Sequence, residues 1–327
     1  MEPYNPGRFM PTRWHLLIAL MVQMSAVSVC TAEDISGDLV VFHAGSLSVP
    51  FKEIARAFNK RYPDVNVLLE SAGSRASARK ISDLNREADV FGSADYTVID
   101  SLLIPDHASW NIRFAANEMV LAYTDASRRA SEISSQNWHQ VLLDENIAYG
   151  RSDPNSDPCG YRTVLTSKLA EIHYSQTGLA SRLLAKDRRH IRPKETDLLA
   201  LLESGEIDYV FNYRSVAQQH GLRWLALPDE INLKNPRMTS DYARVTVDIS
   251  GQTPGSVINK VGAPMVYGVT IPTNAPNPSA ALAFVTFLLS SEGLLIMEKN
   301  GQPALVPSFS DTFDSIPAPL KEFARKS

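Results

Sequence analysis

Cysteine is almost absent from this chain of 327 residues, which contains only Cys30 and Cys159. Because Cys30 lies in a segment that we expect to be removed, Cys159 is left without a partner, and no disulfide is expected within the mature chain. Basic residues are not in excess either, since 32 Lys and Arg residues stand against 36 Asp and Glu residues, for a formal net charge of −4. This balance, without a basic block, argues against a nucleic-acid partner. An anion would have to be bound by local donors rather than by overall charge.

The common motifs of catalysis and nucleotide binding are missing as well. The sequence has no Gly-x-Ser-x-Gly elbow, no phosphate-binding loop, no dinucleotide-binding fingerprint and no paired-cysteine metal site. Its seven histidines are scattered, and we interpret His43 as a structural hydrogen-bond donor rather than a catalyst. A nucleophile with an adjacent base cannot be identified, which argues against an enzyme.

Long apolar runs are absent except near the N-terminus. Two arginines precede the apolar run 16–22, and small residues follow it. This is the pattern of a signal peptide, residues 1–32, that is cleaved after Ala32, and it predicts an exported protein. The alternative is a lipoprotein anchored through Cys30, although Val29 stands where a small residue is usual. The mature protein would lie in the periplasm or on the extracellular face of the membrane.

A strand, a turn and a helix are predicted from residue 39 onward. The apolar run 39–42 is typical of a buried strand. Apolar residues within 51–62 recur with helical spacing, and Ser48 is the expected N-cap of that helix. Gly45 and Ser46 therefore lie where a strand leads into a helix N-terminus, a place at which anions can bind. The same pattern also fits an ordinary strand-turn-helix connection without a ligand.

Strands and helices alternate along the rest of the chain. A second predicted strand, 65–69, leads into a small polar turn, 70–75, and a third strand, 88–92, also ends among small polar residues. Ligands of open parallel sheets collect beyond the carboxyl ends of the strands. Ser46 and Ser74 are therefore expected to lie at the same edge of one sheet.

Two extended apolar segments, 118–124 and 262–271, are interpreted as the places where the chain crosses between two lobes. A long apolar helix is predicted over 279–299, with a C-cap at Asn300-Gly301. The predicted boundaries are residues 37–119 and 268–327 for lobe I and residues 120–267 for lobe II.

Two acidic residues of the middle segment precede predicted helices. Asp157 lies in the predicted loop 151–160, before a helix over 161–174, and Glu195 precedes a helix through 198–202. Periodicity alone favours an interpretation in which both carboxylates cap these helices. An interpretation as ligands of a bound group remains open at this point.

Ten short motifs, spread over most of the chain, form a set that is specific when taken together. They are FHAGSLSVPF (42–51), ESAGSR (70–75), ADVFGSAD (88–95), DPCGYR (157–162), RPKE (192–195), GEIDY (205–209), YRSVA (213–217), LPDEINL (227–233), SEG (291–293) and GQP (301–303). As a set, over residues 37–307, they resemble the tungstate/molybdate-binding components of ABC transporters, in the branch best known from archaea.

The resemblance implies an α/β fold of the type II periplasmic-binding-protein kind, with two α/β lobes joined by two crossover strands and a ligand cleft between them. It implies a monomeric receptor without a cofactor that captures tungstate or molybdate and delivers it to a membrane permease and, through it, to the ATPase. The alternatives are a binding protein for another oxyanion, such as sulfate, or for a small organic anion, and an enzyme on this scaffold.

The resemblance also implies a set of ligand-binding residues. They are Gly45, Ser46, Ser74, Asp157, Pro158, Cys159, Glu195 and Tyr213. In relatives of this branch, the carboxylates corresponding to Asp157 and Glu195 are reported to coordinate the metal of the oxyanion, whereas Cys159 is expected to contribute its amide.

Physical chemistry explains why such a carboxylate pair would be selective. Two ionised carboxylates repel a dianion that is held only by hydrogen bonds, but they are suitable ligands for a hard, highly charged metal centre. Sulfur in sulfate cannot expand its coordination shell in this way, so Asp157 and Glu195 would act against sulfate. Two features depart from the family pattern, namely Asn212, where relatives often carry a carboxylate, and a shortened segment, 175–191.

Overall fold

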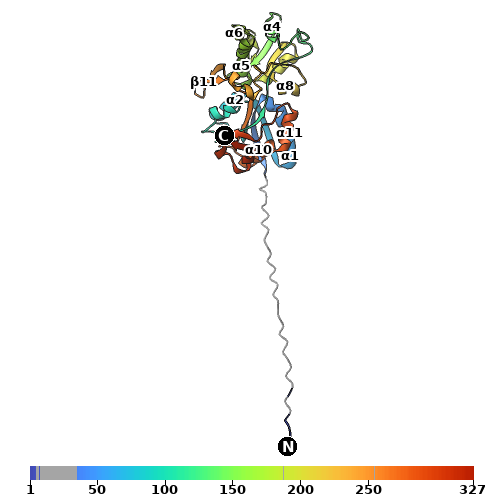
Figure 1. Ribbon diagram of the computed structural model, residues 1–327, viewed down its shortest axis with the longest axis vertical. Coiled ribbons are helices and arrows are strands. Elements are labelled where there is room, and N and C mark those ends of the chain that lie inside the picture. The colour runs from blue at the N-terminus through green and yellow to red at the C-terminus, as the bar shows by residue number, and fades with distance from the viewer. Residues whose placement is uncertain (5–6, 8–34, 187, 254) are drawn as a thin grey trace. The chain divides into compact units, whose positions relative to one another are not determined.

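The computed structural model describes residues 1–4, 7, 35–186, 188–253 and 255–327. The chain divides into two units, residues 1–34 and 35–327, and the second contains all the helices and strands described below (Figure 1). The predicted signal peptide, residues 1–32, falls almost entirely outside the described residues, and so does Cys30. Cleavage after Ala32 and the lipid anchor therefore stay predictions.

The first sheet has five strands in the order β2-β1-β3-β12-β4. Strand β1 pairs in parallel with β2 and β3, whereas β12 is antiparallel to β3 and β4. Because the chain goes from β1 to β2 on one side and then to β3 on the other, the order of connection reverses at β1. The bounds are Gly37–Ala44 (β1), Val65–Ala72 (β2), Val90–Ser93 (β3), Ile112–Ala116 (β4) and Val266–Thr270 (β12).

Helices cover both faces of this sheet. Successive residues of β1 point to opposite faces, so Val41 packs in the cluster that contains Phe58 and Phe284, while Phe42 packs in a second cluster with Ile81. The rings of Phe58 and Phe284 lie 5.3 Å apart between centroids. The helices are Ser48–Arg61 (α1), Ser74–Ser82 (α2), Tyr96–Leu102 (α3), Pro278–Leu289 (α10) and Ser291–Lys299 (α11).

The second sheet also has five strands, in the order β7-β6-β8-β5-β9. Strand β6 is parallel to β7 and β8, and β5 is antiparallel to β8 and β9. Its strands are Met119–Tyr123 (β5), Tyr149–Ser152 (β6), Ile191–Arg192 (β7), Tyr209–Tyr213 (β8) and Arg223–Ala226 (β9). Its helices are Trp138–Leu143 (α4), Pro158–His173 (α5), Leu179–Ala185 (α6), Leu199–Glu203 (α7) and Arg214–Gln219 (α8).

The chain passes from the first sheet to the second between β4 and β5, and after β9 it returns to the first sheet at β12 by way of a separate hairpin. The predicted crossing segments, 118–124 and 262–271, contain β5 and β12, which belong to different sheets. The residue boundaries predicted for the lobes, 37–119 with 268–327 and 120–267, stay predictions.

We call the first sheet with its helices the first half of the molecule, and the second sheet with its helices and the hairpin that follows it the second half. The hairpin has two strands and extends toward α2 (Figure 1). It consists of the antiparallel strands Thr246–Ser250 (β10) and Val257–Val261 (β11). Arg79 of α2 donates a hydrogen bond from Nη2 to Ser250 Oγ at 3.2 Å. A short parallel pair, Ser308–Ser310 (β13) and Ala324–Lys326 (β14), lies near the C-terminus, and helix α9 spans Thr239–Tyr242.

Two local predictions about helix ends are wrong. Ser48 is the first residue of α1 rather than its N-cap, which is Leu47, and the Ser48 hydroxyl donates to Ser71 Oγ at 3.1 Å. The helix predicted over 279–299 is two helices, α10 and α11, bent by 62°. The break lies at Ser290, whose extended backbone ends α10 and whose Oγ accepts a hydrogen bond from Gly293 N at 3.3 Å. Apolar periodicity continues through this capping serine, which is why the pattern conceals the break.

Two other predictions placed loops where regular structure continues. Strand β2 extends to Ala72 and α2 begins at Ser74, so only Gly73 remains of the predicted turn 70–75. The predicted loop 151–160 is shortened at both ends by β6 and α5, because Pro158 takes the first helical position, which it favours. As a result, Ser74 is the first residue of α2 and Asp157 is the N-cap of α5, so both lie closer to helix N-termini than expected.

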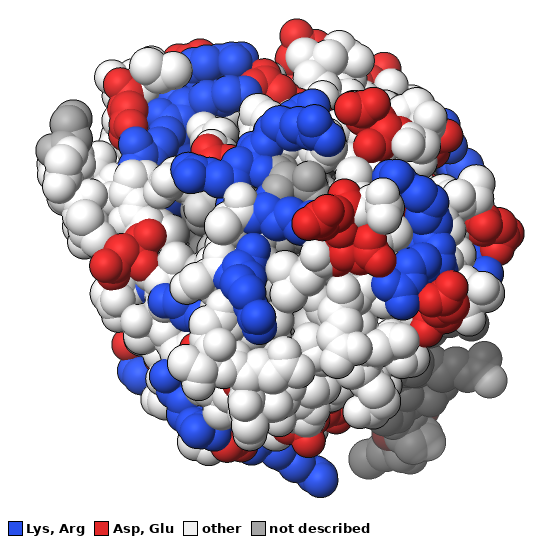
Figure 2. All heavy atoms as spheres, turned by 90° about the horizontal axis from the view of Figure 1, so that it is seen from above, with Lys and Arg blue, Asp and Glu red and all other residues white. Residues whose placement is uncertain are grey.

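Charges of both signs are interspersed on the face seen in Figure 2. This agrees with the nearly balanced composition of the sequence. Among the described residues, no single helix is long and apolar enough to span a membrane; only the bent pair α10 and α11 reaches that length and hydropathy together.

Candidate functional site

All eight residues predicted to bind the ligand are buried, and they lie at the ends of elements from both sheets. Gly45 and Ser46 begin the 3₁₀ turn η1, Gly45–Leu47, after β1, and Ser74 begins α2 after β2. Asp157, Pro158 and Cys159 form the N-terminus of α5, Glu195 opens the 3₁₀ helix η3, Glu195–Leu198, and Tyr213 ends β8. The expected meeting of Ser46 and Ser74 at the carboxyl edge of the first sheet is consistent with the pairing of Ala44 with Ala72.

The carboxylate of Asp157 caps α5. It accepts hydrogen bonds from Cys159 N at 3.3 Å, through Oδ1, and from Glu195 N at 3.1 Å, through Oδ2. The capping interpretation is therefore correct for Asp157. The same carboxylate also holds the backbone at Glu195, which joins the two acidic positions although 38 residues separate them.

Glu195 does not cap a helix. The N-cap of η3 is Lys194, and both Glu195 carboxylate oxygens are buried without a hydrogen-bond partner among the described residues. The side chain is only 1% exposed. A buried charge without a partner typically costs roughly 3–5 kcal/mol, so this carboxylate is the feature of the site that most needs an explanation.

Gly45 makes room for the Glu195 carboxylate. A Cβ atom at position 45 would lie 2.7 Å from Glu195 Oε1 and 2.8 Å from Oε2, closer than such atoms approach in proteins. The backbone that follows β1 in the first sheet thus touches a carboxylate held by the second half of the molecule. Any side chain at this position would displace Glu195 or separate the two halves.

Burial raises the pKa of Glu195 well above its usual value, and the charge of the neighbouring Asp157 raises it further. Burial also raises the pKa of Asp157, against the opposing effect of the hydrogen bonds that it accepts. When both groups are ionised, the two Glu195 oxygens have no donor; a proton on one carboxyl group would be shared between the pair. These surroundings therefore favour a proton at this place, or a centre of positive charge in its stead.

Three hydroxyl groups lie around the site with their protons uncommitted. Ser74 Oγ accepts from Ala94 N at 3.0 Å, Tyr213 Oη accepts from Arg162 Nη1 at 3.0 Å, and Ser46 Oγ accepts from Tyr267 Oη at 2.9 Å. In the described part of the chain, none of the three donates to a protein acceptor. Each can therefore donate a hydrogen bond to a bound oxyanion.

The two remaining predicted residues, Pro158 and Cys159, have structural roles at the start of α5. Pro158 is the first residue of α5 and has no N–H to offer. Cys159 is a free, buried thiol whose Sγ lies 3.6 Å from Phe211 O, while its amide donates to Asp157. Burial raises the pKa of this thiol well above its usual value. A thiolate ligand is therefore disfavoured, and the amide is engaged in orienting a carboxylate.

Asn212 and His43 form hydrogen bonds with backbone atoms of predicted site residues or of their neighbours. Asn212 Oδ1 accepts from Tyr213 N at 2.7 Å, and its Nδ2 donates to Glu195 O at 3.4 Å. His43 is buried, its Nδ1 donates to Ala44 O at 2.8 Å, and burial lowers its pKa to about 4. Both side chains orient backbone beside the ligand-binding residues, as predicted for His43.

A buried ion-pair cluster that the sequence did not indicate lies beside the site. Asp95, the N-cap of α3, contacts three residues from the other half of the molecule: Tyr161 Oη at 2.6 Å, Lys260 Nζ at 2.6 Å and Arg162 Nη2 at 3.7 Å. Burial raises the pKa of Asp95, but the charges of Lys260 and Arg162 outweigh it and hold the pKa well below its usual value. Arg162 also donates to Ala94 O at 2.8 Å, so this cluster ties the two halves together.

The cluster was missed because its members are far apart in the sequence. Asp95, Tyr161 and Arg162 end or occupy recognised motifs, but nothing in those motifs indicates that they meet. Lys260 carries no sequence signal at all.

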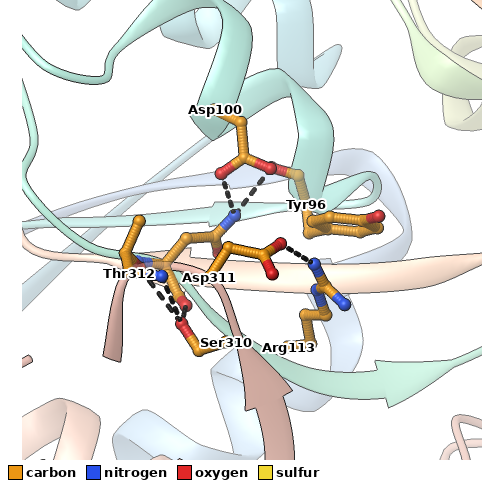
Figure 3. Close-up of a pocket in the computed structure, with 7 residues that line it drawn as sticks. Tyr96, Asp100, Arg113, Ser310, Asp311 and Thr312 are labelled. Atoms are coloured by element: carbon orange, nitrogen blue, oxygen red, sulfur yellow. Dashed lines mark hydrogen bonds and ion pairs between the residues drawn. The ribbon is translucent and has the colours of Figure 1, made fainter. Parts of the chain in front are cut away.

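A small cavity near Asp95 does not belong to the site. It measures about 10 Å³, roughly the space of one water molecule, and its lining is shown in Figure 3. Its charged groups are paired internally: Arg113 Nη2 lies 2.8 Å from Asp311 Oδ2 and its guanidinium lies over the Tyr96 ring, while Asn111 donates to Asp100 at 3.0 Å. It is too small to hold an oxyanion.

The described residues contain no group of three or more His, Cys, Asp or Glu side chains that could hold a metal ion. Two carboxylates alone supply too few ligands for a bare cation. They would suffice for a metal centre that brings its own oxygen ligands.

The sequence matches the family described as bacterial extracellular solute-binding protein over residues 39–302. It is 50% identical over 295 residues to an uncharacterized solute-binding protein of Petrotoga mobilis, which covers 90% of this chain and 92% of the relative. It is 39% identical over 311 residues to the molybdate/tungstate-binding protein WtpA of Pyrococcus abyssi, which covers 86% of this chain and 88% of that protein.

Solved structures of similar fold include a sulfate-binding and a molybdate-binding protein. The sulfate-binding protein SubI of Mycobacterium tuberculosis superposes with a TM-score of 0.60 at 13% identity, over 83% of this chain and 88% of that one. The periplasmic molybdate-binding protein of Azotobacter vinelandii superposes with a TM-score of 0.56 at 17% identity, over 82% and 99%. At these identities the structures establish the fold, and they confirm the predicted two-lobe α/β architecture of the periplasmic-binding-protein kind.

Proposed function

The chain belongs to the family of bacterial extracellular solute-binding proteins, and from this premise we propose that it captures tungstate or molybdate for an ABC importer. The oxyanion is held between the two lobes and is passed to the membrane permease, which works with its ATPase. The protein acts by binding and carries out no reaction, so it needs no cofactor. Its signal-peptide pattern places it outside the cytoplasmic membrane, where we expect a monomer.

The buried Glu195 carboxylate beside Asp157 is the observation that carries this proposal. For a bound dianion at about 4 Å, each ionised carboxylate would add about 8 kcal/mol of repulsion at an effective dielectric constant near 20, because each pair of unit charges contributes about 4 kcal/mol. The repulsion is replaced by attraction if the carboxylate oxygens coordinate the central metal. Tungsten and molybdenum are hard centres of high formal charge, which favour oxygen ligands.

The opposite wall of the site suits the oxygen atoms of the same anion. Ser46, Ser74 and Tyr213 donate hydrogen bonds to them, since each hydroxyl proton is uncommitted in the empty site. Gly45 brings the first-lobe backbone against Glu195, so that the central atom lies between the donors and the carboxylates. Hydroxyls bind any tetrahedral oxyanion, whereas the carboxylates exclude one whose central atom cannot accept further ligands.

Binding requires the two lobes to separate and close. The eight site residues are buried in the structure, so a ligand cannot reach them without such a movement. The cluster of Asp95 with Tyr161, Arg162 and Lys260 forms across the two halves and stabilises the closed form.

Calorimetry on the mature protein tests the proposal directly. Tungstate and molybdate should each bind with a stoichiometry of one, whereas sulfate and phosphate should not bind at the same concentrations. Elemental analysis of protein purified without added oxyanion should detect tungsten or molybdenum. Sulfate binding as tight as tungstate binding would overturn the assigned role of the carboxylates and support the alternative, a receptor for another oxyanion.

A further inference from the structure

A chain of hydrogen bonds behind the site leads from the first crossing between the sheets to Ser46. Asn117 lies in that crossing, between β4 and β5, and its Nδ2 donates to Ser215 Oγ at 2.7 Å and to Tyr267 Oη at 2.8 Å. Tyr267, on β12, donates in turn to Ser46 Oγ at 2.9 Å. Tyr267 and Ser46 are completely buried, so bulk water does not compete for these contacts.

The orientation of the Asn117 amide is determined by its other contacts. Asn117 Oδ1 accepts from Glu118 N at 2.9 Å and from Ser215 N at 3.4 Å. A rotated amide would direct its NH₂ group at these two N–H donors, which would leave all of them without acceptors. The NH₂ group therefore faces Tyr267, and an amide N–H can only donate.

The direction of the next two hydrogen bonds follows. Tyr267 Oη accepts from Asn117 and has one proton, which it gives to Ser46 Oγ. Burial raises the pKa of Tyr267 to about 12, so the phenol keeps this proton at neutral pH. Ser46 is thereby an acceptor toward Tyr267, and its own proton has to be directed elsewhere. Gln302 Nε2 holds the Ser46 carbonyl at 2.9 Å, which keeps the residue in place.

We propose that Tyr267 is a positioning residue for ligand binding, which makes Ser46 a hydrogen-bond donor to the oxyanion without touching the oxyanion itself. The inference rests on the proposed function and extends it to residues outside the predicted ligand-binding set. Asn117 is the origin of this polarity, and it contacts Ser215 of α8 as well as Tyr267 of the first sheet. The direction in which Ser46 donates its proton is thus set by Asn117, at the crossing between the lobes.

A double-mutant cycle with Tyr267→Phe and Ser46→Ala tests the role. Phenylalanine keeps the ring packing of Tyr267 against Phe114, whose centroid is 6.1 Å away, and removes only the hydroxyl. Tungstate affinity, measured by calorimetry, should fall about 5- to 10-fold in Tyr267→Phe, the typical net effect of one hydrogen bond. In the Ser46→Ala background the same change should alter the affinity less than about twofold, because the orientated proton is already absent.

Tyr209→Phe is the matched control. Tyr209 is also completely buried, but it begins β8, which Tyr213 ends, and its hydroxyl donates to Arg128 O at 2.7 Å. This variant should keep the tungstate affinity of the parent. Any loss of stability from the unpaired Asn117 N–H occurs in both backgrounds of the cycle and cancels from the comparison.

The possible results are distinct. Equal losses of affinity from Tyr267→Phe in both backgrounds would show a purely structural role and overturn the inference, as would unchanged affinity in the single variant. In either case the proposed function would stand, because the parent binds tungstate. A parent protein that binds neither tungstate nor molybdate would overturn the proposed function and, with it, the role of Tyr267.

Discussion

The two walls of the candidate site present opposite chemistry. The wall that follows the first sheet offers neutral donors, the hydroxyls of Ser46 and Ser74, beside the bare backbone of Gly45. The wall that belongs to the second sheet presents the carboxylates of Asp157 and Glu195. Neutral donors are satisfied by any oxyanion, but buried carboxylates are stabilised only by a positive centre or a proton. Under the proposed function the difference separates two tasks, because the first wall would bind the oxygen atoms of the anion and the second would coordinate its central atom.

The largest effect on ligand binding is expected from removing the Glu195 carboxylate, which has no hydrogen-bond partner among the described residues. In Glu195→Gln, tungstate affinity should fall by roughly 100-fold or more, equivalent to about 2.7 kcal/mol or more, because an amide is a far poorer ligand for a highly charged metal. The ligand-free variant should be at least as stable as the parent near neutral pH, since the neutral amide cannot ionise in this buried place. Calorimetry and thermal unfolding measure the two effects.

The matched control for this variant is Glu203→Gln, an exposed acidic residue at the end of α7 in the same half of the molecule. It should change neither tungstate affinity nor stability appreciably. Unchanged tungstate affinity in Glu195→Gln would contradict metal coordination by this residue.

A smaller effect is expected from pushing the two walls apart. In Gly45→Ala the new Cβ would approach the Glu195 oxygens to 2.7 and 2.8 Å, so the carboxylate must move or the lobes must close incompletely. We expect a loss of tungstate affinity of about 10-fold, corresponding to about 1.4 kcal/mol. Small-angle scattering with saturating tungstate should show a larger radius of gyration than for the parent. A variant that binds and closes like the parent would show that the contact with Gly45 is not required.

The smallest expected effect is on the pH dependence of stability. It distinguishes the two walls, because only the second wall, with Asp157 and Glu195, carries carboxyl groups that titrate. The pKa values of Glu195 and Asp157 are raised in the folded, empty protein, so the native state binds more protons than the unfolded state above the ordinary value of about 4.5 for Glu. The stability of the empty protein should therefore fall as the pH rises through this window, by at most about 1.4 kcal/mol per pH unit for each group.

Thermal unfolding of the empty protein between about pH 5 and about pH 8 measures this slope, which Glu195→Gln should reduce. His43 contributes the opposite slope below its ordinary value of 6.5, because burial lowers its pKa to about 4. The difference between parent and Glu195→Gln removes that contribution. Identical slopes for the two proteins would contradict a raised pKa at Glu195.

Capping shows how far local patterns can be trusted in this chain. The sequence favoured caps at both acidic positions, and the structure confirms one at Asp157 but not at Glu195. A cap depends on the backbone within a few residues, so a rule based on neighbours can be right for Asp157. The surroundings of Glu195 are determined by Gly45, 150 positions earlier in the chain. The same limitation hid the break at Ser290, where a local serine cap interrupts a continuous apolar stripe.

The alternation of strands and helices and the position of Ser46 and Ser74 after parallel strands could be predicted from the sequence alone, and its resemblance to a family supplied a predicted set of site residues. These are properties of short segments, which period and turn chemistry express directly. The tertiary structure was needed to show that Glu195 has no hydrogen-bond partner among the described residues, that Asp95 contacts Lys260, and that the Tyr267 hydroxyl donates to Ser46. Burial and the direction of a hydrogen bond depend on what packs around a group, and here those neighbours come from the far side of the fold.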